Sequence, residues 1–275
     1  MNDFELFFHE DLGSKGDITS KVLLSHELGQ GVILAKDDCI LAGAEEAKYI
    51  FKSLGGRVHL CHKDGCKISQ GTTVLEVKGP AQSILSGERL ALNFLGRMSG
   101  IATLTRELVD STHQLNPHLS IAATRKTTPG FRKYEKKAVV LGGGFPHRFG
   151  LYDAILIKDN HIALLGSIKT AIKKAQKNLP GVPIEVEVET MEDALIAARL
   201  KVDIIMLDNI PPDKGVLISK KIREICPQTI IEVSGGITPK NIRDYVYADR
   251  ISLGWLTHSV VSKNFSLDML SLIHI

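Results

Sequence analysis

The 275-residue sequence is poor in cysteine, in aromatic residues and in any excess of charge. Four scattered cysteines exclude a disulfide-stapled scaffold and favour reduced thiols in a cytoplasmic protein. The 34 basic and 31 acidic residues are interspersed, so no broad basic surface for nucleic acid or membrane is predicted. No apolar run approaches the roughly 20 residues of a membrane helix. The acidic start MNDFELFFHEDLG also lacks the basic segment of a secretory signal.

What is present is enough apolar sequence for a sizeable core. A hydrophobic content of 44% in a chain of this length predicts one large globular domain or two modest ones. The first hundred residues mix strand-like and helix-like segments without a regular rhythm, which favours an α+β sandwich. The expected helices are 4–12, 45–54 and 82–113, the last broken or kinked near Ser99-Gly100, and the expected strands are 31–36, 40–42, 57–62 and 73–77.

Four residues in this region have a spacing that suggests a zinc site: His59, Cys61, His62 and Cys66. Side chains alternate along a strand, so His59 and Cys61 would share one face and His62 would point to the other. Ligands on opposite faces do not converge on one ion. We therefore expect ordinary strand and hairpin residues here.

From Ile121 onward, short apolar strands alternate with helices, which predicts a parallel sheet of βα units. The expected strands are 121–123, 154–157, 184–188, 204–207, 230–233 and 251–253, and the expected helices are 131–140, 168–177, 191–200, 214–225 and 239–247. The predicted fold class is α/β, with an incomplete βα barrel of parallel strands after an N-terminal α+β open sandwich. We place the first domain at 1–103, joined by the tail 256–275, and the barrel at 104–255.

Each expected strand of the barrel ends at a polar or glycine-rich position, where βα-barrel enzymes build their active sites. These positions are Arg125 and Lys126, Lys158, Glu187 and Glu189, Asp208, Ser234-Gly235-Gly236, and Gly254. His147 and Arg148 add a second basic pair between the first two strands. Clustered cations are costly unless an anion neutralises them, so this set predicts an anionic ligand.

The segment IEVEVE, residues 184–189, alternates strictly between apolar and acidic residues. In a barrel wall with helices outside, the glutamates point inward and require cations. Glu187 with Asp208 predicts a Mg²⁺ site, because Mg²⁺ binds few protein carboxylates and takes further oxygens from water and phosphate. Ser234-Gly235-Gly236 before a helix start, together with Gly254, predicts a phosphate site made of backbone N–H groups.

Three motifs, TRKTTPG, GGG-x-PHR-x-GL-x-D and LIKDNH, closely resemble the signature of the quinolinate phosphoribosyltransferase family. The resemblance runs from EDLGSKGDIT to Thr257-His258-Ser259. It implies transfer of phosphoribose from phosphoribosyl pyrophosphate to quinolinate with loss of carbon dioxide, a step of NAD biosynthesis. It also implies Mg²⁺ as cofactor, and a homodimer or larger homo-oligomer in which Arg89 enters the partner's site.

The resemblance assigns roles residue by residue. Catalytic roles fall on Lys126, Lys158, Glu187 and Asp208, and metal binding on Glu187 and Asp208. Substrate binding falls on Arg89, Thr124, Arg125, Lys126, His147, Arg148, Lys158, Ser234, Gly235, Gly236, Gly254 and His258. Two departures from the family pattern are Pro146, where many relatives have asparagine, and a shortened link between Tyr245 and Asp249.

Three other functions remain open from the residues alone. Lys158 at a strand end would suit a Schiff-base aldolase, although the acidic pair and the other cations would then have no role. A related pyrophosphorylase of molybdenum utilisation is a closer alternative, against which the intact LIKDNH argues. A non-catalytic binding protein would have no need for acidic and basic strand ends to converge. No nucleic-acid or membrane partner is expected.

Overall fold

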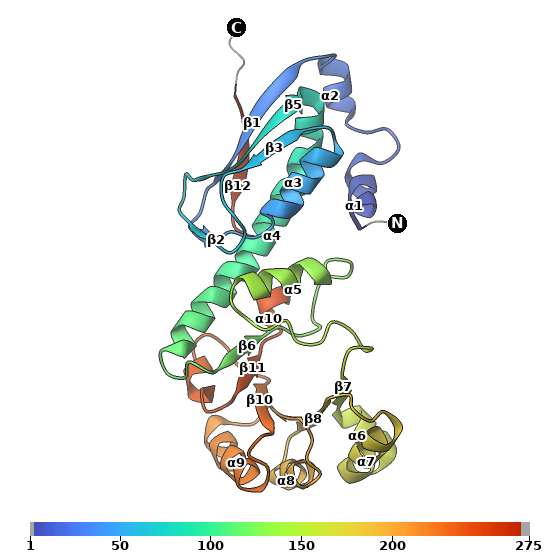
Figure 1. Ribbon diagram of the computed structural model, residues 1–275, viewed down its shortest axis with the longest axis vertical. Helices are drawn as coiled ribbons and strands as arrows, with labels where there is room; N and C mark the ends of the chain where they lie inside the picture. Colours follow the sequence, from blue (N-terminus) through green and yellow to red (C-terminus); the bar gives the residue numbers. More distant parts are fainter. Residues whose placement is uncertain (1–2, 271–275) are drawn as a thin grey trace. The chain divides into compact units, whose positions relative to one another are not determined.

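The computed structural model describes residues 3–270, which form two compact units (Figure 1). The first unit contains the described residues up to Arg106, residues 128–143, and the described residues from Thr257 onward. The second contains Glu107–Thr127 and Gly144–Leu256. Residues 128–143, which the sequence analysis assigned to the barrel, therefore group with the first unit. Part of the expected tail, 271–275, lies outside the described residues.

The second unit is built on a six-stranded sheet in the order β6-β11-β10-β9-β8-β7. Its strands are β6 (Ser120–Ala122), β7 (Ile155–Ile157), β8 (Ile184–Val188), β9 (Ile204–Asp208), β10 (Ile230–Ser234) and β11 (Arg250–Ser252). All neighbouring strands pair in parallel, as the βα rhythm predicted. The two edges, β6 and β7, do not pair with each other within residues 3–270. Phe145 instead forms a parallel bridge to Ala122 on the free side of β6.

Helices α6 (Asp159–Leu165), α7 (Ile168–Asn178), α8 (Met191–Arg199) and α9 (Pro212–Ile225) connect these strands. The Ser167 and Thr190 hydroxyls cap α7 and α8 by accepting main-chain N–H groups at 3.1 Å. The sequence analysis missed α6. Its helix over 239–247 was wrong, since only a 3₁₀ turn, Ile242–Tyr245, forms there. Asn241 accepts the Thr238 N–H at 2.7 Å, and the Ile242 N–H donates to the Thr238 carbonyl at 3.0 Å, so one helical turn starts there before the 3₁₀ turn.

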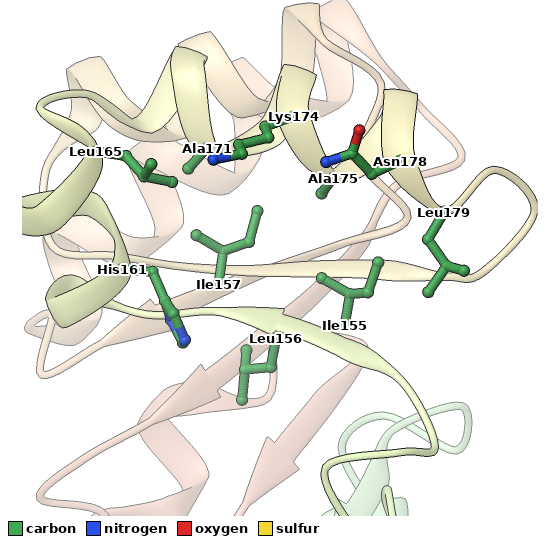
Figure 2. A pocket seen from close by; sticks show the side chains of 10 residues that line it. All are labelled: Ile155, Leu156, Ile157, His161, Leu165, Ala171, Lys174, Ala175, Asn178 and Leu179. Atoms are coloured by element: carbon green, nitrogen blue, oxygen red, sulfur yellow. The ribbon is translucent and has the colours of Figure 1, made fainter.

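Packing behind β7 is incomplete. A cavity of about 320 Å³ lies between β7 and helices α6 and α7 (Figure 2). Ile155 and Ile157 point into it from the strand, while Leu156 points to the opposite side, as alternation requires. Leu165 and Leu179 also line the cavity, so its wall is largely apolar.

The first unit contains a four-stranded antiparallel sheet in the order β12-β1-β5-β3. Its strands are β1 (Leu28–Ala35), β3 (Arg57–Leu60), β5 (Thr73–Pro80) and β12 (Phe265–Leu270), and β2 (Cys39–Ile40) pairs separately with β4 (Lys67–Ile68). Helix α3 (Ala44–Ser53) packs on β3 and β5. At the N-terminus lie α1 (Asp3–Leu12) and α2 (Ile18–Leu23), and Asp17 caps α2 by accepting the Ser20 N–H at 3.0 Å.

Helix α4 runs unbroken from Ala81 to His113, so the predicted break at Ser99-Gly100 was wrong. Its glycines permit close packing. A Cβ on Gly100 would lie 2.4 Å from the carbonyl oxygen of Val261, and one on Gly96 would lie 2.8 Å from that of Lys263. The Ser99 hydroxyl accepts the N–H of Ala42 at 3.0 Å and donates to its carbonyl at 3.1 Å. No helix within residues 3–270, α4 included, is both long enough and apolar enough to cross a membrane.

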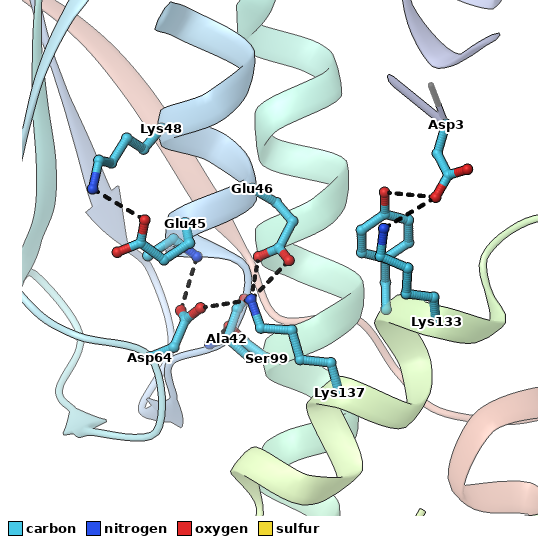
Figure 3. Close-up of polar contacts among 11 residues, drawn as sticks. Asp3, Ala42, Glu45, Glu46, Lys48, Asp64, Ser99, Lys133 and Lys137 are labelled. Carbon is cyan, nitrogen blue, oxygen red and sulfur yellow. Dashed lines mark hydrogen bonds and ion pairs between the residues drawn. The ribbon is translucent and has the colours of Figure 1, made fainter. Parts of the chain in front are cut away.

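Helix α5 (Arg132–Leu141) is held within the first unit by ion pairs (Figure 3). The Lys137 ammonium lies 2.7 Å from Glu46 of α3 and 3.4 Å from Asp64. Glu135 is fully buried and accepts hydrogen bonds from Arg97 at 2.8 Å and from the Thr128 N–H at 3.1 Å. Removing the partner of a buried carboxylate strongly destabilises a fold, because the charge is then left unpaired. The ion pair between Glu135 and Arg97 therefore fixes α5 against α4.

Aromatic rings join α1, α4 and α5 of the same unit. Phe94 of α4 lies 5.5 Å from Phe4 and 4.8 Å from Tyr134, measured between ring centroids. Phe7 and Phe131 complete the group at 6.1 Å from each other. Such pairs contribute about 0.5–1.5 kcal/mol each beyond their buried area. Five aromatic rings thus pack together where three helices of this unit meet.

Candidate active site

The carboxyl ends of the six parallel strands place the expected site residues along one edge of the sheet. Following the strand order from β6 to β7, these residues are Arg125, Gly254, Ser234, Asp208, Glu187 and Lys158. The register is direct: Ser234 pairs with Asp208 across β10 and β9, and Ile157 pairs with Val186, which brings Lys158 beside Glu187. Residues that lie far apart in the sequence therefore share one edge, as predicted from the strand ends.

Arg125 and Arg148 carry like charges close together. Arg125 follows β6, and its Nε is buried without a hydrogen-bond partner among residues 3–270. Arg148 follows the Phe145 bridge, and its guanidinium donates to the Ala154 carbonyl at 3.3 Å. Burial, and then the positive charge of Arg125, lower the pKa of Arg148. Two partly desolvated guanidinium groups with so few partners form a site suited to a carboxylate or phosphate.

Lys158 and Glu187 form an ion pair at the other side of this edge. The Lys158 ammonium lies 2.5 Å from Glu187 Oε2, and the carboxylate is nearly buried, with 12% of its side chain exposed. The main chain of Lys158 begins α6, where its N–H donates to His161 Nδ1 at 3.0 Å. The short strand and the immediate helix start thus fix the base of the lysine side chain.

Asp208 ends β9 beside Glu187 of β8. Its Oδ2 accepts a hydrogen bond from the Asn209 amide at 2.6 Å, while Glu187 Oε2 is occupied by Lys158. Each carboxylate thus retains one oxygen outside these contacts. Two hard oxygen donors on neighbouring strands suit Mg²⁺, which commonly takes its other ligands from water and phosphate. The residues present therefore fit the expected cofactor.

The loop after β10 turns through two glycines in left-handed conformations, with φ of +85° at Gly235 and +63° at Gly236. A Cβ on Gly235 would lie 2.2 Å from the Asn209 side-chain oxygen, so the close approach of the β9 and β10 loops requires glycine there. The Trp255 indole donates to the Ile237 carbonyl at 2.7 Å and fixes the far end of the loop. Only the 3₁₀ turn Ile242–Tyr245 follows this loop, so the predicted helix start after Gly236 does not form, and backbone N–H groups are what the loop itself offers to a phosphate.

His147 joins a buried charged cluster that the sequence analysis identified only in part. Its Nε2 lies 3.3 Å from Glu185 and 3.4 Å from Glu232, and Arg250 donates to Glu232 at 3.0 Å. Burial raises the pKa of Glu185. Burial would also raise the pKa of Glu232, but His147 and then Arg250 lower it overall. Glu232 and Arg250 were missed, although a glutamate inside the apolar strand IIEV was an available signal.

The histidine ring receives opposing influences. Burial alone would lower the pKa of His147, but the carboxylates beside Nε2 raise it to about 9. The Arg148 N–H donates to Nδ1 at 2.8 Å. This hydrogen bond favours the neutral ring and so lowers the pKa of His147, because a protonated Nδ1 cannot accept a hydrogen bond. The proton on the ring therefore belongs on Nε2, facing the carboxylates.

The remaining expected site residues lie as follows. The Thr124 hydroxyl accepts the Lys126 N–H at 3.0 Å, which turns the chain directly after β6. Lys126 itself is exposed. Arg89, on α4, and His258, in the short helix α10 (Trp255–His258), are both exposed and belong to the first unit. The ring of His258 hydrogen-bonds the Ser259 hydroxyl at 2.6 Å.

A parallel βα sheet with acidic, basic and glycine-rich strand ends at its carboxyl edge defines a barrel enzyme that binds anionic substrates. Comparison with known families makes this specific. The model of the N-terminal domain of quinolinate phosphoribosyl transferase matches residues 17–99, and that of its C-terminal domain matches residues 101–268. The chain belongs to this family, which confirms the resemblance seen in its motifs.

Relatives from distant organisms align along most of the chain. A Bacillus subtilis protein described as a probable carboxylating nicotinate-nucleotide pyrophosphorylase is 45% identical over 269 residues, covering 96% of this chain and 91% of its own. The human carboxylating nicotinate-nucleotide pyrophosphorylase is 35% identical to this chain, and the alignment covers 87% of this chain and 82% of the human protein. The solved Francisella tularensis nicotinate-nucleotide pyrophosphorylase aligns with a TM-score of 0.90 and 34% identity, covering 97% and 94%. The predicted fold class is therefore confirmed.

Proposed function

We propose that this chain transfers phosphoribose from phosphoribosyl pyrophosphate to the ring nitrogen of quinolinate. Pyrophosphate and carbon dioxide are released, and nicotinate mononucleotide is formed for NAD biosynthesis. The observation that carries the proposal is the pair of guanidinium groups, Arg125 and Arg148, at the carboxyl edge of the sheet. Lys158 lies across the same edge, so a small dicarboxylate is the ligand that meets these cations from two sides.

The acidic and glycine-rich strand ends fit the other substrate. Glu187 and Asp208 would hold Mg²⁺ and the ribose hydroxyls, and Lys126 would meet a phosphate. The 5′-phosphate would bind the N–H groups after β10 together with Gly254. When bound, Mg²⁺ would neutralise charge on the departing pyrophosphate.

The chemistry needs charge and placement more than a nucleophile. Departure of pyrophosphate leaves a sugar with oxocarbenium character, so the side chains act by holding the quinolinate nitrogen in line with the anomeric carbon. Glycosylation makes that nitrogen cationic, and the cationic nitrogen stabilises the carbanion left by decarboxylation. That carbanion then takes up one proton, which gives nicotinate mononucleotide. Arg125 and Arg148 then hold the reacting ring in place while the site excludes water.

We also propose that the enzyme is cytoplasmic and forms a homodimer or larger homo-oligomer. The exposed Arg89 of α4 would enter the site of a partner subunit and add another cation for quinolinate. Four cysteines without disulfides within the described residues fit a reducing compartment.

The aldolase alternative is weakened by the contacts of Lys158. An aldolase would leave its ion pair with Glu187, and the other cations at the same edge, without a role. A related pyrophosphorylase acting on another acceptor would use the same phosphoribosyl site. The second carboxylate of quinolinate is the feature that Lys158 would recognise.

The test is an ultraviolet assay for nicotinate mononucleotide formed from quinolinate, phosphoribosyl pyrophosphate and magnesium. We expect turnover by the full chain and a loss of most activity in Arg148→Ala and Lys158→Ala, with both variants folded by circular dichroism. Nicotinate, which lacks one carboxylate, serves as the matched substrate control and should react poorly. If the full chain makes no product while remaining folded, the proposed function is wrong.

A further inference from the structure

Three buried charged side chains lie inside the second unit, behind the candidate site. Glu185 of β8 is 2% exposed and Glu232 of β10 is fully buried, and the Arg250 side chain is 12% exposed. The Arg250 guanidinium also lies over the ring of Phe145, 4.3 Å from the ring centroid. Phe145 precedes His147 by two residues. Charges are rarely buried without a specific task, because their desolvation is not recovered by a single ion pair. Neither glutamate has a place in the reaction described above.

His147 connects this cluster to the candidate dicarboxylate site. Its backbone is left-handed, with φ of +54°, a conformation uncommon for residues other than glycine. Both ring nitrogens are engaged: Nε2 faces Glu185 at 3.3 Å and Glu232 at 3.4 Å, and Nδ1 accepts the N–H of Arg148 at 2.8 Å. The ring therefore links two buried carboxylates to the main chain of the residue that carries the candidate guanidinium.

A metal ion is the first alternative, since the ligand atoms of His147, Glu185 and Glu232 lie within 4.8 Å of one another. The hydrogen bond at Nδ1 argues against it. An ion on Nε2 would leave the imidazole protonated on Nδ1, and a protonated Nδ1 cannot accept the Arg148 N–H. A proton on Nε2 fits both contacts at once. The nearby Arg250 guanidinium also disfavours a further cation.

We propose that Glu185 and Glu232 are positioning residues for the dicarboxylate. They fix the His147 ring, and the ring fixes the turn that carries Arg148. The inference rests on the proposed function for the identity of the ligand. Its physical basis is local: carboxylate oxygens of Glu185 and Glu232, 3.3 and 3.4 Å from Nε2, attract the Nε2 side of the ring, and a ring that rotated away from them would no longer offer Nδ1 to the Arg148 N–H. Displacements of about 1 Å in a positioning group can reduce rates about a hundredfold.

The first experiment compares Glu185→Leu with Glu185→Gln in the full chain. Glutamine keeps an oxygen that accepts from Nε2–H, whereas leucine keeps the bulk and removes the acceptor. We expect Glu185→Leu to raise KM for quinolinate about tenfold or more, with KM for phosphoribosyl pyrophosphate within about twofold. Glu185→Gln should stay within about threefold of wild type in both. Glu224→Gln, an exposed glutamate of α9 paired with Lys221, is the control.

A purely structural role would give another pattern. If Glu185→Leu lowers Tm but leaves KM for quinolinate unchanged, or raises KM for both substrates equally, the positioning role is excluded. His147→Gly separates ring from backbone, because glycine adopts the left-handed turn without a ring. We expect His147→Gly to lose quinolinate affinity as Glu185→Leu does. Retention of wild-type affinity by His147→Gly would overturn the proposal.

A measurement independent of turnover separates this inference from the proposed function. In ¹⁵N NMR spectra of the full chain recorded above pH 9, where the ring is neutral, and assigned by comparison with His147→Asn, the His147 ring should carry its proton on Nε2. Glu185→Leu should change that signal and Glu224→Gln should not. If the wild type shows this signature but makes no product, the function fails while the positioning network stands. A ring protonated on Nδ1, or a metal ion that copurifies and is lost in Glu185→Leu, would refute the network.

Discussion

Replacing Arg148 by methionine should separate activity from stability. Methionine approximates the length of the arginine stem but removes the guanidinium. Truncating one partner of a desolvated charged contact costs about 2–5 kcal/mol. At about 1.4 kcal/mol per tenfold, kcat/KM for quinolinate should fall by roughly 30-fold to several thousandfold. Most of the loss should appear in KM for quinolinate, because the proposed contact is made in the ground state as well as in the transition state.

The same variant should be as stable as the wild type. The Arg148 guanidinium makes one hydrogen bond of 3.3 Å, and both burial and the adjacent Arg125 disfavour its charge. Removing it relieves that repulsion, so the free energy of unfolding should change by less than about 0.5 kcal/mol or rise.

The measurements are steady-state kinetics with varied quinolinate and urea unfolding without substrate. Arg199→Met, at an exposed position in the last turn of α8, is the matched control and should leave both unchanged. If Arg148→Met retains activity, or if its loss of activity simply follows a loss of folded protein, the reasoning from the two guanidinium groups is wrong.

Three further results are expected. Gly100→Ala should destabilise the chain by about 1–3 kcal/mol in urea unfolding, because the clash with the Val261 carbonyl outweighs the helix propensity of alanine, which is worth about 1 kcal/mol. Ser83→Ala in the same helix is the control. A Gly100→Ala variant more stable than the wild type would contradict the packing described for Gly100. Hydrogen bonds from the Ser20 hydroxyl and N–H lower the pKa of Asp17 in the folded chain. The contribution of Asp17 to the free energy of unfolding is therefore present above its pKa in the unfolded chain and is lost as the pH falls through its pKa in the folded chain. Asp17→Ala should cost about 1 kcal/mol near neutral pH and nothing in strong acid. Chelation by EDTA should abolish turnover until magnesium is restored, and undiminished activity in EDTA would exclude the proposed Mg²⁺ role.

Apolar periodicity was enough to predict the parallel sheet of the second unit. The run IIMLD ends at a polar residue because a strand covered on both faces is apolar until it reaches the edge. The run IIEVS also ends at a polar residue but departs from this rule at the buried Glu232. The edge that carries Lys158, Glu187 and Asp208 followed from that rule alone. Which substrates they meet did not follow, and the motifs were needed to name them.

The failures have local physical causes. Gly100 was interpreted as a helix break, but it is a contact surface for the Val261 carbonyl, and that contact is invisible in the sequence. The segment after Thr238 has helical composition, yet it forms only a 3₁₀ turn, in which the Asp244 N–H donates to the Asn241 carbonyl at 3.0 Å. The cluster around His147 depends on Arg250 reaching Glu232 from an adjacent strand, a tertiary contact that no local pattern encodes.

The chain leaves the first unit and re-enters it twice, so neither unit corresponds to one continuous stretch of gene. A fragment that begins after α4 would carry α5 without the partners of its polar residues. Glu135 would lose Arg97, and Lys137 would lose Glu46 and Asp64. Such a fragment would expose a face evolved to be covered, and we expect it to be insoluble. Recombination between relatives should therefore succeed only when all three segments of the first unit are exchanged together.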